Sequence, residues 1–207
     1  QADELAKLLT KTNTRRQDLT TKAIDHARSQ VSEDLVGVVH HDTWHEGVIG
    51  LVASRLVESF YRPMIVISRG EKFSKGSARS IPGFNIVEAI RASSQYLIDA
   101  GGHPMAAGFT IETRHIEVFK TSINKYAQKI LTVDLLNRSL EIECELERPD
   151  INLENLKIIS NFEPFGVGNQ EPLFMTKNML VEDVRVVGQD SKHVKLQVDG
   201  ISAIGFN

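Results

Sequence analysis

The stretch EGVIGLVASRLVESFYRPMIVI, residues 46–67, decides the fold class of this chain. Its apolar residues recur every four positions, at Val48, Val52, Leu56 and Phe60. This spacing predicts a helix over residues 46–60 with one apolar face, and Pro63 is expected to prevent its continuation. The β-branched run at residues 64–67 then predicts a buried strand. A helix that leads directly into a buried strand is typical of an α/β domain.

Helical and strand-like hydrophobic patterns continue on both sides of this stretch. Further strands are expected at residues 35–39, 73–80 and 109–111. Further helices are expected at residues 5–9, 14–31, 85–100 and 116–130. Gly101-Gly102 is expected to end the third of these helices. The first domain, residues 1–139, is therefore predicted to be an α/β domain with a mixed sheet, flanking helices and a leading connecting helix.

From Leu140 the apolar period changes to two, and four glutamates alternate with the apolar residues up to Glu147. This predicts a half-buried strand, followed by a helix at residues 153–159 behind an Asn152 cap. Four more strands are expected at residues 173–176, 179–187, 193–198 and 201–206. Five short strands in residues 140–207 favour a small OB-like β-barrel, because closure removes exposed strand edges.

Charge differs between the two regions. Residues 1–139 hold 18 Lys and Arg against 15 Asp and Glu, whereas residues 140–207 hold 6 against 12. Within the first region, residues 55–91 carry seven bases and three acids, which is typical either of a solvated basic face or of an anion-binding surface. The opposite signs of the net charges support two domains.

Composition limits the classes of protein to which the chain can belong. Its 41% hydrophobic and 25% charged residues are ordinary for a globular domain, and it has no apolar run long enough for a membrane span. The single cysteine, Cys144, excludes an internal disulfide framework. We expect a cytoplasmic protein, and the absence of an initial Met suggests a piece of a longer one.

His40-His41-Asp42 has the residue types of a metal site. Neighbouring residues at the end of a strand point to opposite faces, so we do not expect these side chains to converge on one ion. Trp44 is expected to pack as an apolar anchor, and Gly47 and Gly50 to permit close contact between helix and sheet.

The segment KGSARS, residues 75–80, indicates a phosphate-binding strand. Ser77 and Arg79 lie two residues apart on one strand face and combine a hydroxyl donor with a guanidinium group. Ser80 completes the candidate set, and Gly76 is expected to leave the backbone open to a ligand. The alternative is an edge strand with solvated polar residues.

The segment GGHPMAAGF, residues 101–109, is the sharper signal. Gly101 and Gly102 bring backbone N–H groups close to a ligand, and His103 offers a donor to an anionic oxygen. A glycine pair alone would indicate only a turn. Small residues on both sides of the histidine favour a binding site.

In this order, residues 44–56, 76–80 and 101–109 resemble the DHH-associated domain of the RecJ family of single-strand-specific 5′ to 3′ DNA exonucleases. Residues 164–174 resemble the loop that opens that family's OB-fold domain, and residues 13–28 its connecting helix. The resemblance implies DNA repair and recombination as the setting and single-stranded DNA as the partner, with single-strand-binding or other repair proteins as further candidates.

The resemblance also implies how the chemistry is divided. Phosphodiester hydrolysis would use manganese or magnesium held by an N-terminal DHH domain that this chain does not contain, so no catalytic or metal-binding residue is expected here and the chain alone should be inactive. Ser77 and Arg79 would hold the 5′ phosphate. Gly101, Gly102 and His103 would hold the nucleotide that is cut.

The predicted barrel departs from the family pattern in its charge. OB folds that bind single strands usually combine a basic groove with stacking aromatic residues, whereas this barrel is acidic. Its aromatic residues are Phe162, Phe165, Phe174 and Phe206, and its candidate basic stripe consists of Lys177, Arg185, Lys192 and Lys195. Two alternatives therefore stay open: a self-standing binding or protein-docking module, and a small-nucleotide phosphodiesterase.

Overall fold

The computed structural model describes residues 2–188 and 191–206. The chain divides into two compact units, Gln1–Arg138 and Ser139–Asn207. The expected domain boundary, between residues 139 and 140, lies one residue beyond this division. Within the described ranges, no helix combines the length and the apolar character that a membrane span requires.

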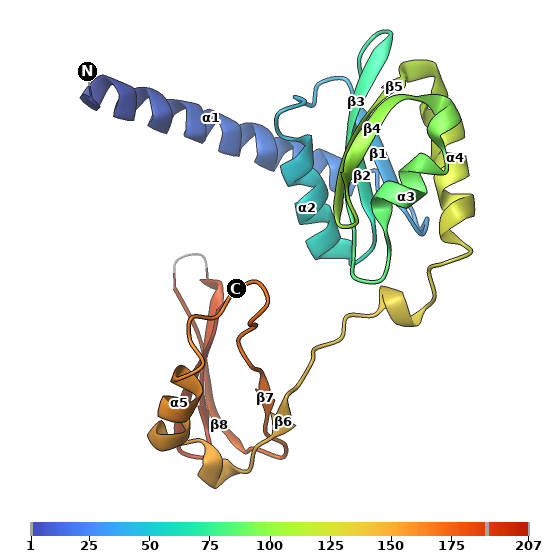
Figure 1. Ribbon diagram of the computed structural model, residues 1–207. Helices are drawn as coiled ribbons and strands as arrows, with labels where there is room; N and C mark the ends of the chain where they lie inside the picture. Colours follow the sequence, from blue (N-terminus) through green and yellow to red (C-terminus); the bar gives the residue numbers. More distant parts are fainter. Residues whose placement is uncertain (1, 189–190, 207) are drawn as a thin grey trace. The chain divides into compact units, whose positions relative to one another are not determined.

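The first unit is built on a five-stranded sheet with the strand order β1-β2-β3-β5-β4 (Figure 1). Its strands are β1 (Gly37–His41), β2 (Met64–Ser68), β3 (Phe73–Arg79), β4 (Leu97–His103) and β5 (Ala106–Glu112). Strands β1 and β2 are parallel, and the other neighbours are antiparallel. Strand β1 begins two residues later than expected, because the N–H and C=O of Val36 bond to the side chain of Asn124.

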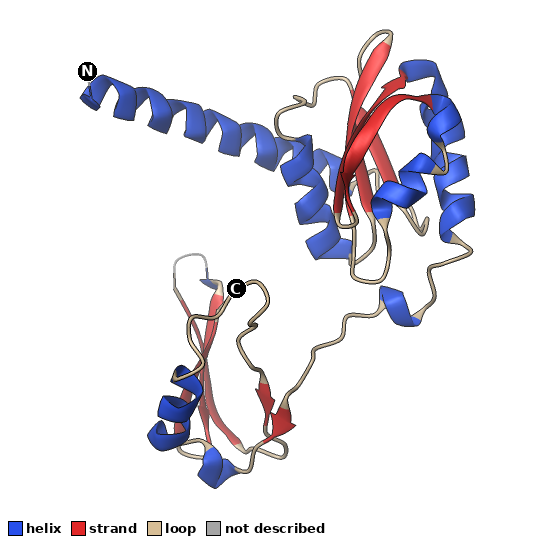
Figure 2. Cartoon of the chain, in the orientation of Figure 1, coloured by secondary structure: helices blue, strands red, loops and turns tan. Residues whose placement is uncertain are grey.

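Helices cover both faces of this sheet (Figure 2). Helices α3 (Ile86–Arg91) and α4 (Ile116–Ala127) cover one face, and α2 (Ile49–Phe60) packs on the other. Strand β2 supplies both cores, since Ile65 and Ile67 pack with α3 and α4 while Met64 and Val66 pack with α2. The predicted α/β domain with a mixed sheet and flanking helices is confirmed.

The two expected N-terminal helices are one continuous helix, α1 (Ala2–Arg28). The predicted break at Thr14 was wrong: its hydroxyl donates to the Thr10 carbonyl inside the helix instead of capping a new one. Only Ala23 and Ala27 of α1 are buried, in the core that α2 and Trp44 share. The predicted apolar stripe of Leu5, Leu8 and Leu9 is exposed.

The helix expected to run up to Gly101 was also wrong. Asn85 caps α3 as predicted, but α3 ends at Arg91, and residues 97–103 form strand β4. Gly102 therefore lies in the sheet and ends no helix. Its φ is +149°, and a Cβ there would come within 2.5 Å of the Ala107 Cα, so the pairing of β4 with β5 requires a glycine.

The second unit contains the five expected strands in two sheets. Strands β8 (Val181–Val187), β9 (His193–Val198) and β10 (Ile201–Gly205) form an antiparallel sheet, and β6 (Cys144–Glu145) pairs in parallel with β7 (Phe174–Met175). Helix α5 (Leu153–Ser160) starts at the predicted Asn152 cap. Strand β6 is much shorter than expected, and the predicted half-burial was wrong: Leu140, Ile142 and Cys144 are exposed.

Replacement of Asn124 tests how the start of β1 is held. Its side chain accepts from the Val36 N–H at 2.9 Å and donates to the Val36 C=O at 3.1 Å, and Val36 is fully buried. Asn124→Ala leaves both backbone groups without these partners, so we expect the free energy of unfolding to fall by about 1–3 kcal/mol in urea. The control is Thr121→Ala, since this exposed hydroxyl bonds only within its own helix. Equal urea midpoints for the two variants would contradict this role.

Candidate functional site

Most of the predicted site residues come together on strands β3, β5 and β4, which are neighbours in the sheet. Arg79 pairs with Ala106, and Ala106 pairs with His103 on its other side. Two residues further along, Ser77 pairs with Gly108, which pairs with Gly101. Directly paired residues share one face of a sheet. We call the six residues of these two rows the open patch.

The open patch lies on the same side of the sheet as α2. Arg79 and Ser77 pair with Met64 and Val66 of β2, whose side chains pack in the α2 core. Gly101, Gly108 and His103 are exposed, whereas Ser77 and Arg79 are half-buried. With about 4.8 Å between strands, the Cα atoms of Arg79 and His103 lie about 10 Å apart.

Arg79 has the properties expected of an anion-binding group. Its Nη1 donates to the Ala78 carbonyl at 2.9 Å and to Ser77 Oγ at 3.3 Å, which orients the guanidinium beside the hydroxyl. No Asp or Glu of the described residues forms an ion pair with it. The positive charge is therefore held in place without a carboxylate to neutralise it.

A third row extends the open patch in the direction of Phe73. Lys75 pairs with Thr110, which pairs with Asp99, and Lys75 Nζ donates to Thr110 Oγ1 at 2.7 Å. Lys75 could have been predicted, because it lies two residues from Ser77 on the same strand face. Thr110 was missed, because only the register of β5 against β3 places it here.

Ser80 and Gly76 do not belong to this surface. Ser80 is buried, and its hydroxyl donates to the Phe84 carbonyl at 2.6 Å, so it stabilises the loop after β3. Gly76 faces the opposite core, where a Cβ would collide with the ring of Phe109. The expectation that Gly76 leaves the backbone open to a ligand was therefore wrong. Gly102 lies between the two rows and pairs with the buried Ala107.

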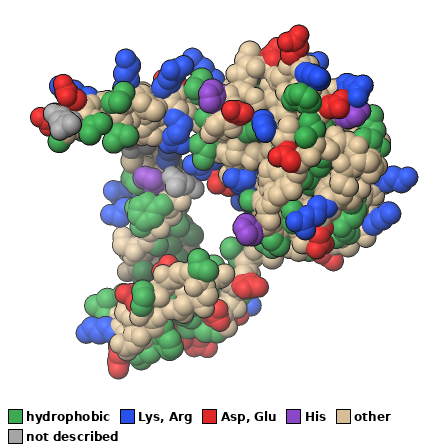
Figure 3. All heavy atoms as spheres, turned by 45° about the horizontal axis from the view of Figure 1, so that its top comes forward, with side chains coloured by type: hydrophobic (Ala, Val, Ile, Leu, Met, Phe, Trp, Pro, Cys, Tyr) green, Lys and Arg blue, Asp and Glu red, His purple; other side chains and the backbone are tan. Residues whose placement is uncertain are grey.

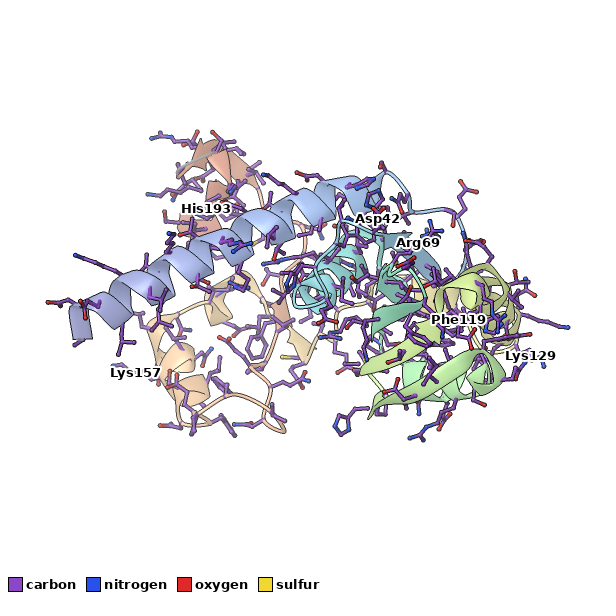
Figure 4. All side chains as sticks on the ribbon, turned by 90° about the horizontal axis from the view of Figure 1, so that it is seen from above. Asp42, Arg69, Phe119, Lys129, Lys157 and His193 are labelled. Carbon is purple, nitrogen blue, oxygen red and sulfur yellow. The ribbon has the colours of Figure 1, made fainter. Side chains whose placement is uncertain are left out.

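The three side chains of the His40-His41-Asp42 segment do not converge on one point, although His41 Nδ1 lies 3.0 Å from Asp42 Oδ1. His40 Nε2 lies 3.1 Å from Glu117 Oε1 on α4, whereas the His41 ring lies beside His26 of α1. Figure 4 labels Asp42, which follows β1 and lies near Arg69 after β2. Trp44 is buried and packs in the core shared by α1 and α2, which confirms its predicted role as an apolar anchor.

The second unit brings two of its predicted basic residues together. Arg185 and Lys195 are paired on β8 and β9 and line a hollow of about 150 Å³ together with Asp183, Gln197 and Ser202. Arg185 is also ion-paired with Asp183, and Lys177 with Glu145. Acidic and basic side chains are interspersed on the face shown in Figure 3. Because Arg185 is ion-paired with Asp183, Lys195 is the less neutralised of the two basic residues that line the hollow.

Two family models match successive parts of the chain. The DHHA1 domain matches residues 30–129, which include the whole open patch, and the RecJ OB domain matches residues 142–207.

Known proteins match most or all of the chain. The single-stranded-DNA-specific exonuclease RecJ of Bacillus subtilis is 35% identical over 100% of this chain and 28% of its own length. RecJ of Haemophilus influenzae is 32% identical over 82% of the chain and 31% of its own length. The crystal structure of RecJ from Thermus thermophilus in complex with Mn²⁺ superposes on 99% of the chain with a TM-score of 0.84 and 29% identity, and the match covers 30% of that protein.

The chain thus spans about 30% of the length of these relatives. The two domain matches occur in the order predicted from the motifs, and the fold agrees over both units. By sequence and by structure, this chain belongs to the RecJ family, as a DHHA1 domain followed by a RecJ OB domain.

Proposed function

We propose that this chain is the part of a RecJ-type 5′ to 3′ exonuclease that binds the end of single-stranded DNA. The observation that carries the proposal is the pairing that puts Arg79 and His103 in one row, and Ser77 and Gly101 in the next, on one face of the sheet. Relatives are described as single-stranded-DNA-specific exonucleases. Repair and recombination of DNA, within the cytoplasm, is the setting that we propose.

Ser77 and Arg79 would bind the 5′ phosphate. A guanidinium group offers several N–H donors in a plane and matches two phosphate oxygens, and a hydroxyl adds one more donor. The side chains already lie together, with Arg79 Nη1 3.3 Å from Ser77 Oγ. A phosphate can bind there without first displacing a carboxylate.

Gly101 and His103 would hold the nucleotide that follows. A Cβ at Gly101 would meet no atom of the described chain within 4 Å, so packing does not require a glycine there. The lack of a side chain at Gly101 instead leaves space for a ligand beside His103. We therefore infer that Gly101 serves the ligand, whereas Gly102 mainly serves the pairing of β4 with β5.

The residues of the open patch do not fit a metal site. They offer a guanidinium, a hydroxyl, one imidazole and backbone groups, and metal sites need several carboxylate, imidazole or thiolate ligands together. Manganese and magnesium are bound in structures of Thermus thermophilus RecJ. In the whole protein we propose that such ions activate water in a DHH domain outside this chain, so the chain alone binds DNA without cutting it.

The OB domain leaves room for a second role. Val184 and Val186 of β8 are 57% and 60% exposed, and exposed apolar surface on a folded domain can mark a protein-interaction site. This favours docking of another repair protein over extensive DNA contact by this domain. DNA affinity that does not change in Arg79→Ala would favour the alternative of a self-standing binding or protein-docking module. A preference for dinucleotides over longer strands would instead favour a small-nucleotide phosphodiesterase.

Removal of the Arg79 guanidinium tests the phosphate contact. We expect Arg79→Ala to lower the affinity for a 5′-phosphorylated single strand by about tenfold or more, because a charge-assisted hydrogen bond is lost. The slope of log affinity against log salt should flatten by about 0.7 for each lost phosphate contact. The control is Arg114→Ala, which removes the same charge from an exposed residue paired with Glu112. Equal affinities and slopes for the two variants would contradict the assignment.

Substitutions of Gly101 and Gly102 test whether the space left by the missing side chain is occupied by a ligand. Gly101→Ala should leave the melting temperature unchanged and weaken DNA binding by about tenfold, because the methyl group fills ligand space only. Gly102→Ala should lower the melting temperature, because its φ of +149° and its contact with Ala107 both oppose a side chain. Differential scanning fluorimetry and fluorescence anisotropy separate the two effects. Unchanged binding by Gly101→Ala would exclude the ligand from this part of β4.

A further inference from the structure

Strand β3 begins with an exposed aromatic residue, Phe73, at the end opposite to Arg79. Phe73 is 48% exposed and packs in neither of the two hydrophobic cores that the described residues form. The pairing of β3 with β5 runs from Phe73 to Arg79 without a register shift, and the three residues at the alternate positions are buried. Alternate residues of a strand share one face of the sheet. Phe73 therefore lies on the same face as Lys75, Ser77 and Arg79.

Lys75 lies between this ring and the open patch. Its Nζ donates to Thr110 Oγ1 at 2.7 Å, which holds the ammonium group close to the sheet. Within the described ranges, no carboxylate lies within ion-pair distance of Lys75. Its positive charge is therefore available to a phosphate.

Positive charge also predominates around the ring of Phe73. Residues 69–75, together with Glu112 and Arg114, hold four bases and two acids. Lys72 Nζ lies 5.2 Å from the centroid of the Phe73 ring, and Glu112, the strand partner of Phe73, is ion-paired with Arg114 at 2.7 Å. Exposed aromatic rings among basic side chains are the combination with which proteins bind single-stranded nucleic acid through base stacking and phosphate contacts.

The direction of the strand decides which ligands could reach the ring. Phe73 and Arg79 are six positions apart on β3, so at about 3.4 Å per residue their Cα atoms lie about 20 Å apart. A dinucleotide that occupies Arg79 and His103 extends across the strands and not along β3. In the next part of the sheet, Asp99 occupies the β4 end of the row that contains Lys75. Phosphates that follow are therefore attracted to the β3 side of the sheet, in the direction of Phe73.

We propose that the part of β3 beyond Ser77 is a second contact region for the strand, in which Lys75 binds an internal phosphate and Phe73 stacks on a base. The ligand is single-stranded nucleic acid longer than a dinucleotide. The inference rests on the proposed function, and it adds a preference for longer strands to the binding of the strand end.

Isothermal titration calorimetry tests this inference with two unlabelled 5′-phosphorylated strands, a dinucleotide and an octanucleotide that begins with the same two bases. The wild-type chain should bind the octanucleotide more tightly. Phe73→Leu keeps an apolar side chain but removes the aromatic face, so the affinity for the octanucleotide should fall by about tenfold while that for the dinucleotide stays unchanged. Phe73→Trp retains an aromatic face and should bind both strands as the wild-type chain does.

Two further variants complete the experiment. Lys75→Gln should weaken only octanucleotide binding and should flatten the slope of its log affinity against log salt by about 0.7. The control is Val118→Ala, which shortens an exposed apolar side chain on α4, on the opposite face of the sheet, and should change neither affinity. Thermal unfolding of every variant is recorded, and if Phe73→Leu unfolds early, Phe73→Trp and Lys75→Gln decide.

The outcomes separate this inference from the proposed function. A wild-type chain without preference for the octanucleotide, or an octanucleotide affinity that either Phe73→Leu or Lys75→Gln leaves unchanged, would overturn the second contact region. Equal weakening of both strands by Phe73→Leu would indicate a structural effect on the open patch and would also overturn it, as would a loss of octanucleotide affinity in Phe73→Trp. In each of these cases the proposed function stands if Arg79→Ala weakens binding of both strands. No response of either strand to Arg79→Ala would overturn the proposed function itself.

Discussion

The antiparallel pairing of β5 between β3 and β4 is the constraint on which the proposed site depends. It places Arg79 and His103 against the same residue, Ala106, although they are far apart in the sequence. A shift by one residue in either ladder would turn one side chain to the opposite face of the sheet. The register is fixed by the other face, where Ala78 and Ala107 are buried against α3 and α4. The apolar core thus determines which polar residues share the exposed side.

Glycines have at least three separate roles around this sheet. Gly76 makes room for the ring of Phe109, and Gly102 permits the close approach of β4 to β5. Gly101 is not demanded by packing, which makes it the more informative position for function. A Cβ at Gly50 would lie 3.1 Å from both Arg79 Nη2 and Ser77 Oγ. The lack of a side chain at Gly50 therefore leaves room for the two groups that we assign to the ligand. Structural and functional glycines cannot be told apart by their residue type, but the neighbours that a Cβ would meet distinguish them.

Sequence periodicity predicted those elements whose hydrophobic pattern has only one interpretation. The four-residue repeat of α2 and the β-branched run of β2 were correctly assigned, and so was the parity that places Ser77 beside Arg79. Strand β4 was missed because Gly101 and Gly102 carry no side-chain pattern and resemble a helix stop. Ser80 was included in the site because its carbonyl partner, Phe84, is known only from the fold. The contact of Gly50 with Arg79 likewise depends on how α2 packs on the sheet, which no local pattern encodes.

The most direct test of the account is an NMR titration of the isotopically labelled chain with a 5′-phosphorylated trinucleotide. The largest amide shift changes should occur at the ends of β3 and β4 that carry Ser77, Arg79, Gly101 and His103. The amide shifts of the core residues of α4, which lies on the opposite face of the sheet, should stay unchanged. Shift changes confined to β8 and β9 of the OB domain, with none on β3 and β4, would contradict the claim that the open patch binds the DNA end.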